Sequence, residues 1–260
     1  MDKNLRLSDN KNSRFLMKKE MFISALAALF VGCSTVSKNM NERSPTSATS
    51  PQLFLNSAPI FDFECQQKTG FQTDPSMQVE LGQKLSQFQS QWDKRADILV
   101  SSSESAAGRK FSRKEFSVAL TLCKWTPMGD PAFIVSVRPY LGSSRIDGNA
   151  KLPFNMTTFV SMTHHELLHS LVDNIVNDKL SQSSVLLEKY KNEHFNVLAH
   201  LHLMAIQKSV NEKLNDKELI QATDQLYSYI SGDYARAWEI VRIEGPEKFL
   251  TELQAYNANN

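Results

Sequence analysis

All six histidines of this 260-residue chain lie between positions 164 and 202, and three of them fall in one predicted helix. Apolar residues recur at helical spacing through residues 157–174, so this segment is expected to be a helix with a buried side. Residues four apart share a helix face, which places His165 beside His169. Neutral imidazole is a common metal ligand, so the clustering favours a metal site.

Residues 165–169 form the pattern His-Glu-x-x-His, which is typical of zinc hydrolases. Glu166 follows the first ligand and is angled to reach a zinc-bound water rather than the metal. Zinc lowers the pKa of that water to about 7, and the carboxylate accepts its proton as hydroxide attacks a carbonyl. We therefore expect His165 and His169 to bind Zn²⁺ and Glu166 to act as general base.

Two neighbouring residues have secondary assignments. His164 points about a quarter-turn away from the ligand face, and we expect it to pack or to support a ligand. Asp173 lies on the ligand face, where it either orients an imidazole or is an ordinary exposed acid.

At this motif, on an apolar helix directly after a predicted sheet, the chain resembles the zincin metallopeptidases. The resemblance implies a zinc cofactor and a peptide or protein substrate. In the metzincin subgroup the pattern continues with Gly and His at set distances, and here Val172 and Ile175 occupy those places. The metzincin subgroup is therefore excluded, and a gluzincin-like arrangement, with a ligand from a following helix, is favoured.

The third ligand is expected in the segment after the motif helix. Glu188 lies nineteen residues after His169, a spacing that resembles the gluzincin aminopeptidases. Glu193 and His200 share one face of a helix that is otherwise apolar, and a buried imidazole without a partner costs about 1–3 kcal/mol. We predict His200 as the ligand, with Glu193 as the close alternative and Glu188 as the second. His202 lies about 200° round the helix from His200, so the two do not share one ion.

The N-terminus has the pattern of a targeting segment. A lysine pair precedes the apolar run 21–32, which fits a secretory signal and is too short to span a membrane. Residues 30–33, Phe-Val-Gly-Cys, resemble the lipobox of bacterial lipoproteins, in which the cysteine is lipidated and becomes the mature N-terminus. The resemblance implies that Cys33 is lipidated and that the chain is exported and anchored to the membrane of the cell envelope, with its domain in the periplasm or outside.

The remaining chain divides into a tether and one domain. Residues 1–33 form the leader, and residues 34–57, rich in Ser, Thr, Asn and Pro, predict a flexible tether. Residues 58–260 are expected to form the hydrolase domain. Cys65 and Cys123 remain in an oxidising compartment, where a disulfide and two buried thiols are both open.

Composition excludes some function classes. Apolar residues make up 41% of the chain, enough for a hydrophobic core, so wholesale disorder is excluded. The net charge is +1, from 29 basic and 28 acidic residues, and no basic stripe is present. We therefore expect no nucleic-acid partner.

The predicted elements favour an α+β fold. A helix begins at Asp74-Pro75, and a small antiparallel or mixed sheet comes next, with its last two strands joined by a hairpin loop. The C-terminal part is mostly helical and carries the His-Glu-x-x-His helix. The expected strands are 96–101, 116–123 and 132–138, and the later helices are 157–174, 184–214 with a break near 192, 216–230, 233–243 and one after 245–246.

These observations predict a membrane-anchored, extracytoplasmic zinc hydrolase, with peptidase as the expected activity. The alternative is a non-catalytic exported lipoprotein with a structural or degenerate metal site. The number of protein ligands separates the two, because a catalytic zinc has three and a structural zinc has four. Tyr229, Tyr234 and Arg236 are candidates for stabilising an oxyanion, and the sequence assigns them no role.

Overall fold

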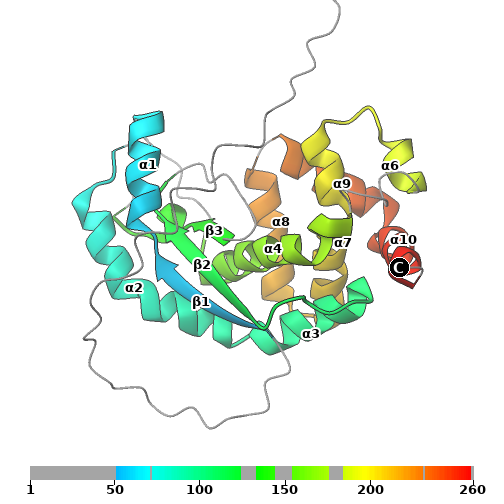
Figure 1. Cartoon of the computed structure of the whole chain (residues 1–260), viewed down its shortest axis with the longest axis horizontal. Helices are drawn as coiled ribbons and strands as arrows, with labels where there is room; N and C mark the ends of the chain where they lie inside the picture. The colour runs from blue at the N-terminus through cyan, green and yellow to red at the C-terminus, as the bar shows by residue number, and fades with distance from the viewer. Residues whose placement is uncertain are drawn as a thin grey trace, which may run out of the picture. The chain divides into compact units, whose positions relative to one another are not determined.

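The structure, a computed structural model, describes residues 51–70, 72–123, 133–143, 154–175, 184–230 and 232–258, with only the backbone of residues 173–175. The leader and most of the expected tether lie outside these residues. Ten helices and three strands, in the element order of Figure 1, make up the described part. They are β1 (Gln52–Ser57), α1 (Pro59–Thr69), α2 (Pro75–Asp93), α3 (Ala96–Ala107), β2 (Glu115–Thr121), β3 (Phe133–Ser136), the 3-10 helix η1 (Arg138–Tyr140), α4 (Met156–Ile175), α6 (Val185–Lys189), α7 (Phe195–Leu214), α8 (Lys217–Tyr229), α9 (Asp233–Glu244) and α10 (Pro246–Ala258).

The sheet is parallel, so the expected antiparallel or mixed sheet is wrong. β1 pairs with β2 and β2 pairs with β3, both in parallel register. A hydrogen bond of 2.9 Å from the Val137 amide to the Thr121 carbonyl holds the carboxyl ends of β2 and β3 side by side. Residues 133–135 are all buried, which is typical of strands covered on both faces. Such a run lacks the alternation of buried and exposed residues that is typical of antiparallel sheets. The expected hairpin between β2 and β3 is wrong as well, because a hairpin joins antiparallel strands; its loop, residues 124–131, lies outside the described part.

The first strand corrects the expected boundary between tether and domain. β1 occupies residues that the Ser- and Pro-rich composition assigned to the tether, so the folded part begins before Ala58. Leu53 and Leu55 are buried and alternate with exposed neighbours, the pattern of a half-buried strand. The strand is stable only because β2 supplies its hydrogen-bond partners, and composition alone does not reveal that pairing.

The expected strand at 96–101 is also wrong, because these residues begin helix α3. Their short apolar run is compatible with a strand or with a buried helix segment. The buried positions along α3 are spaced three or four apart, as on one helix face. The helix ends at Gly108, whose φ of 68° lies in the left-handed region that glycine adopts without a steric penalty.

Most of the expected helices are confirmed. The Asp74 carboxylate accepts a hydrogen bond of 2.8 Å from the Ser76 amide and caps α2, with Pro75 at the first helical position. α4, α8 and α9 lie within two residues of their expected bounds, and α10 begins at Pro246, where a last helix was expected. The expected break near residue 192 separates α6 from α7.

Helix α1 has no counterpart in the sequence-based prediction, and it is attached to the sheet in two ways. A disulfide joins Cys65 of α1 to Cys123, which settles the choice between a disulfide and two thiols. The buried Asp62 carboxylate accepts hydrogen bonds from the Thr121 hydroxyl and, at 2.7 Å, from the Leu122 amide. Both links hold α1 against the carboxyl end of β2.

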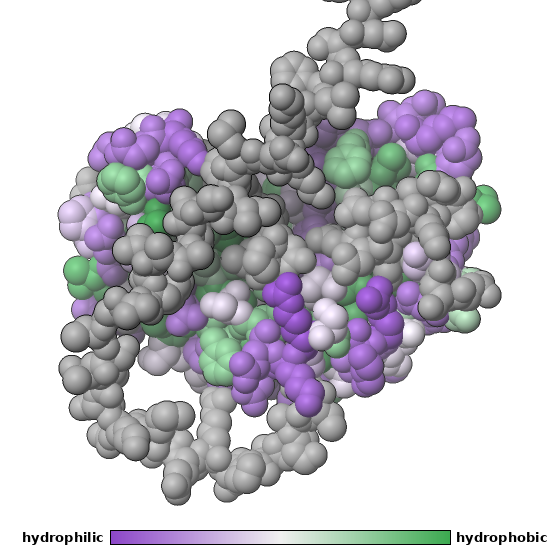
Figure 2. Space-filling view, in the orientation of Figure 1, coloured by the Kyte–Doolittle hydropathy of each residue, from purple (hydrophilic) through white to green (hydrophobic). Residues whose placement is uncertain are grey.

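Helix α4 is the centre of the described fold. It packs against β3, α2, α3, α7 and α8, and in Figure 1 it lies between the sheet and α7. Hydrophilic residues dominate the face in Figure 2, with smaller apolar areas between them, as expected where the outer helices each bury one side. Among the described helices, none is both long and apolar enough to cross a membrane.

Glu80 of α2 stabilises the turn that follows η1 through hydrogen bonds, and these bonds lead to a prediction about the stability of the protein. Its carboxylate accepts hydrogen bonds of 2.7 Å from the amides of Gly142 and Ser143, and it lies 2.6 Å from the Lys84 ammonium. Partial burial raises the pKa of Glu80, but the hydrogen bonds from Lys84 and Ser143 outweigh it and lower the pKa to about 2.

Glu80→Gln is therefore expected to lower the free energy of unfolding at pH 7 by about 1–3 kcal/mol. A lowered pKa in the folded state contributes stability above the unfolded-state pKa of about 4.5, and this contribution is lost as the pH falls toward 2. The difference between the two proteins should narrow over that window in urea melts. Glu64→Gln, which alters an exposed pair with Lys68, is the control and should change little. A difference that is absent at pH 7, or constant from pH 7 to 2, would contradict the assignment.

Candidate metal centre

Helix α4 places the motif inside the protein. Its apolar side, which includes Leu167, Leu168 and Leu171, is fully buried. At its start, the Asn155 side chain accepts a hydrogen bond of 2.9 Å from the Thr158 amide, which satisfies one of the free amides of the first turn. The helix thus holds its polar face against α7 and α8, and His165 has no exposed surface.

His165 and His169 of α4 meet His200 of α7. The ring centroids are 5.1 Å apart for His165–His169, 5.4 Å for His165–His200 and 5.1 Å for His169–His200. Each residue offers one nitrogen, and the three nitrogens lie within 4.8 Å of one another. In the described part of the chain, this is the group of side chains able to hold a metal ion, and it unites the three histidines that the sequence predicted as ligands.

Two of the three rings present their Nε2 atoms to the group. His200 Nδ1 lies 2.5 Å from the Asn196 carbonyl, which only accepts, so Nδ1 carries the proton and Nε2 the lone pair. His165 Nδ1 lies 2.6 Å from the Tyr227 hydroxyl, while its Nε2 is buried without a hydrogen-bond partner among the described residues. A lone pair of this kind suits a metal ion, which would supply the partner that the protein lacks.

Burial also keeps His165 neutral. Desolvation lowers its pKa well below the ordinary value of 6.5, and the neighbouring His169 and His200 lower it further. A metal binds the neutral imidazole, so a ring that resists protonation is suited to be a ligand.

Glu166 lies beside this group without belonging to it. Its Oε2 atom is 3.9 Å from His169 Nε2, and the side chain is almost completely buried. Its negative charge contributes to raising the pKa values of Tyr227 and Tyr234, after the larger effect of burial. The carboxylate therefore lies next to the imidazole group, within reach of a molecule bound there.

The structure places the two alternative third ligands elsewhere. Glu193 precedes α7 and accepts hydrogen bonds of 2.9 and 2.7 Å from the Arg236 guanidinium. Glu188 is exposed and pairs with Lys191 at 2.6 Å. Neither joins the histidine group.

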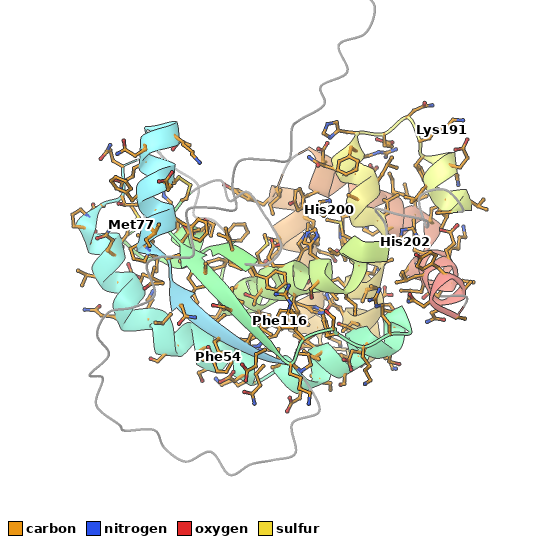
Figure 3. The ribbon with its side chains drawn as sticks, viewed as in Figure 1. Phe54, Met77, Phe116, Lys191, His200 and His202 are labelled. Atoms are coloured by element: carbon orange, nitrogen blue, oxygen red, sulfur yellow. A yellow bond between two sulfur atoms is a disulfide. The ribbon has the colours of Figure 1, made fainter. Side chains whose placement is uncertain are left out.

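The other three histidines have separate partners. His202 faces α10, where its Nε2 lies 3.1 Å from Glu252, while His200 on the same helix faces α4 (Figure 3). His164 lies 2.8 Å from the Ser103 hydroxyl of α3, and burial lowers its pKa to about 3. His194 is exposed and pairs with Asp233 at 2.6 Å. The packing of His164 against α3 and the separation of His202 from His200 agree with the sequence-based expectations.

Of the candidates for stabilising an oxyanion, Tyr234 lies at the site. Its ring centroid is 4.5 Å from that of His200 and 5.6 Å from that of His165. Burial, with help from the charges of Glu166 and Asp233, raises its pKa to about 12, so it keeps its proton. Arg236 is occupied by Glu193, and Tyr229 packs against Phe154.

Sequence reasoning missed Tyr227 and Gln207. Tyr227 contacts His165 directly, and Gln207 is linked to His165 through Tyr227. Tyr227 lies in an aromatic-rich segment, which is more often typical of core packing than of a functional site. Gln207 lies seven residues after His200, so the two share one face of α7, and a buried amide there is a usable indication. The side chain of Asp173, the expected orienting residue, lies outside the described part.

Comparisons of the chain with protein-family models, with curated proteins and with solved structures found no match.

Proposed function

We propose that this protein is a membrane-anchored, extracytoplasmic zinc hydrolase that cleaves peptide bonds. His165, His169 and His200 would hold the zinc ion, and Glu166 would act as general base. The observation that carries the proposal is the meeting of three imidazole nitrogens within 4.8 Å, with a buried carboxylate beside them. Imidazole nitrogen is a preferred zinc ligand.

The number of ligands favours a catalytic site over a structural one. Within the described residues the group has three members, and three protein ligands leave one coordination position for water or substrate. A closed site needs a fourth ligand. Glu193, the close alternative ligand in the sequence analysis, is paired with Arg236. This pairing supports the enzyme over the alternative of a non-catalytic lipoprotein with a structural site.

The chemistry follows from the residues around the group. A zinc ion held there supplies a Lewis acid that makes water more acidic and polarises a substrate carbonyl. Glu166 accepts the proton of the attacking water and returns it to the leaving amine as the carbon–nitrogen bond breaks. Burial of Glu166 limits its contact with bulk water, and its Oε2 atom lies 3.9 Å from His169 Nε2.

Export and anchoring rest on the N-terminal pattern, a lysine pair and an apolar run that ends at Cys33. The disulfide between Cys65 and Cys123 fits this proposal, because such bonds persist in oxidising compartments.

The direct test is metal analysis of the purified protein together with a peptide-cleavage assay on an unfolded protein substrate. We expect one zinc per chain, loss of cleavage on treatment with a chelator and recovery on addition of zinc. Absence of zinc binding would overturn the proposal. Tightly bound zinc without cleavage of any peptide in a mixed pool would favour the structural alternative.

Tyr234→Phe tests the contribution of the phenol beside the ligand group. We expect kcat to fall by about 10- to 100-fold, because a hydroxyl that stabilises the oxyanion is worth this much or more in other hydrolases. Zinc content should stay unchanged, since the ring remains and the proposed ligands are the three histidines. Tyr229→Phe removes a hydroxyl from an exposed ring and is the matched control. An unchanged kcat in Tyr234→Phe would remove this residue from the mechanism.

A further inference from the structure

A chain of hydrogen bonds runs from His165 into the core, away from the metal group. The Tyr227 hydroxyl lies 2.6 Å from His165 Nδ1 and 2.6 Å from Gln207 Oε1. Gln207 Nε2 lies 2.9 Å from the main-chain carbonyl of Ser161, one turn before His165 on α4. All four residues are buried, so water does not compete for these bonds.

The donor and the acceptor of every hydrogen bond in this chain follow from its last member, the main-chain carbonyl of Ser161. The Ser161 carbonyl only accepts, so the amide nitrogen of Gln207 faces it and the amide oxygen faces Tyr227. That oxygen also only accepts, so Tyr227 donates its single proton to it. The phenol oxygen must then accept from His165, which places the ring proton on Nδ1 and the lone pair on Nε2.

We propose that Tyr227 and Gln207 are positioning residues of the metal centre, which hold His165 in the tautomer and orientation that direct its Nε2 lone pair at the metal. This inference rests on the proposed zinc site and adds how one of its ligands is prepared. Metal-bound histidines commonly donate their second nitrogen to a carboxylate or carbonyl. Here the Tyr227 hydroxyl is the acceptor for the second nitrogen of His165. It acts as an acceptor because its own proton is donated to the side-chain amide of Gln207.

The hydrogen-bond chain makes a specific prediction for Gln207, which is one residue further from the His165 ring than Tyr227. Gln207→Leu removes the acceptor of the Tyr227 proton, so the phenol can donate to His165 Nδ1 instead. That bond favours the opposite tautomer, with the proton on Nε2, which cannot bind a metal. Loss of Gln207 should therefore weaken zinc binding although the phenol next to His165 is intact.

The test measures the zinc dissociation constant of the full-length protein by competition with a chromophoric chelator. We expect Tyr227→Phe and Gln207→Leu each to weaken zinc binding by about 10- to 100-fold, the usual effect of losing such a partner. In the Tyr227→Phe background, Gln207→Leu should add no further loss, because no phenol proton remains to be redirected. A purely structural effect would instead add in the double variant.

Thr223→Val is the matched control. Its hydroxyl belongs to the same buried cluster and lies 2.7 Å from the Ser161 hydroxyl, but it is not part of the chain to His165. We expect lower thermal stability and unchanged zinc affinity. Wild-type affinity in Tyr227→Phe and Gln207→Leu, or additive losses in the double variant, would overturn the inference and leave the zinc site standing. Absence of zinc binding by the wild-type protein would instead overturn the proposed function.

Discussion

Replacement of Glu166 by glutamine is expected to reduce kcat/KM for peptide cleavage by about 10²- to 10⁴-fold while zinc stays bound. The amide has nearly the shape of the carboxylate but cannot accept a proton from water. Glu166 lies 3.9 Å from His169 Nε2 and outside the ligand group, so its loss should not release the ion. Kinetics and metal analysis on the same preparation measure both effects.

The control for this variant is Glu188→Gln, which changes an exposed glutamate paired with Lys191 and should leave cleavage unchanged. Full activity in Glu166→Gln would exclude Glu166 as the general base. Loss of zinc in Glu166→Gln would make the carboxylate a fourth ligand, which indicates a closed, structural site.

Replacement of His200 by alanine is expected to weaken zinc binding by more than about 100-fold, beyond the range for residues that only support a ligand. In the proposed site His200 supplies the ligand from α7, and without it the two histidines of α4 would hold the ion alone. The variant should also lose cleavage, because Glu166 then has no bound water to deprotonate. Competition with a chelator measures the affinity, and circular dichroism checks that the helices remain.

Two variants make the His200 result specific. His194→Ala removes an exposed histidine that pairs with Asp233, and Glu193→Gln changes the sequence-based alternative ligand, which pairs with Arg236. Both should bind zinc as the wild-type protein does. A large loss of zinc affinity in Glu193→Gln, with wild-type affinity in His200→Ala, would show that Glu193 and not His200 is the ligand.

The sequence predicted the helices well because their evidence is local. Asp74-Pro75 begins α2, and Gly245-Pro246 separates α9 from α10. Helical periodicity over residues 157–174 also placed α4, and the polar face shared by Glu193 and His200 singled out His200 on an apolar segment. Each of these patterns depends on residues within a few turns of one another.

Most of the errors concern contacts between distant segments; the exception is residues 96–101, whose local pattern was misread. Residues 96–101 have the apolar content of a strand, but continuation of the pattern through Ala107 makes them helical. The direction of β3 depends on where the chain re-enters the sheet, and a run of buried residues does not record it. β1 forms because β2 lies beside it, so a strand inside a polar segment was missed.

The sequence by itself placed His165 and His169 on one face of α4, because residues four apart on a helix have a fixed mutual position. Only the tertiary structure decided between His200, Glu193 and Glu188, since a ligand from another helix depends on how α7 packs on α4. It also decided the orientation of His165, through a hydrogen-bond chain over α4, α7 and α8. Such a chain leaves no periodic pattern, because its members are brought together by packing and not by spacing.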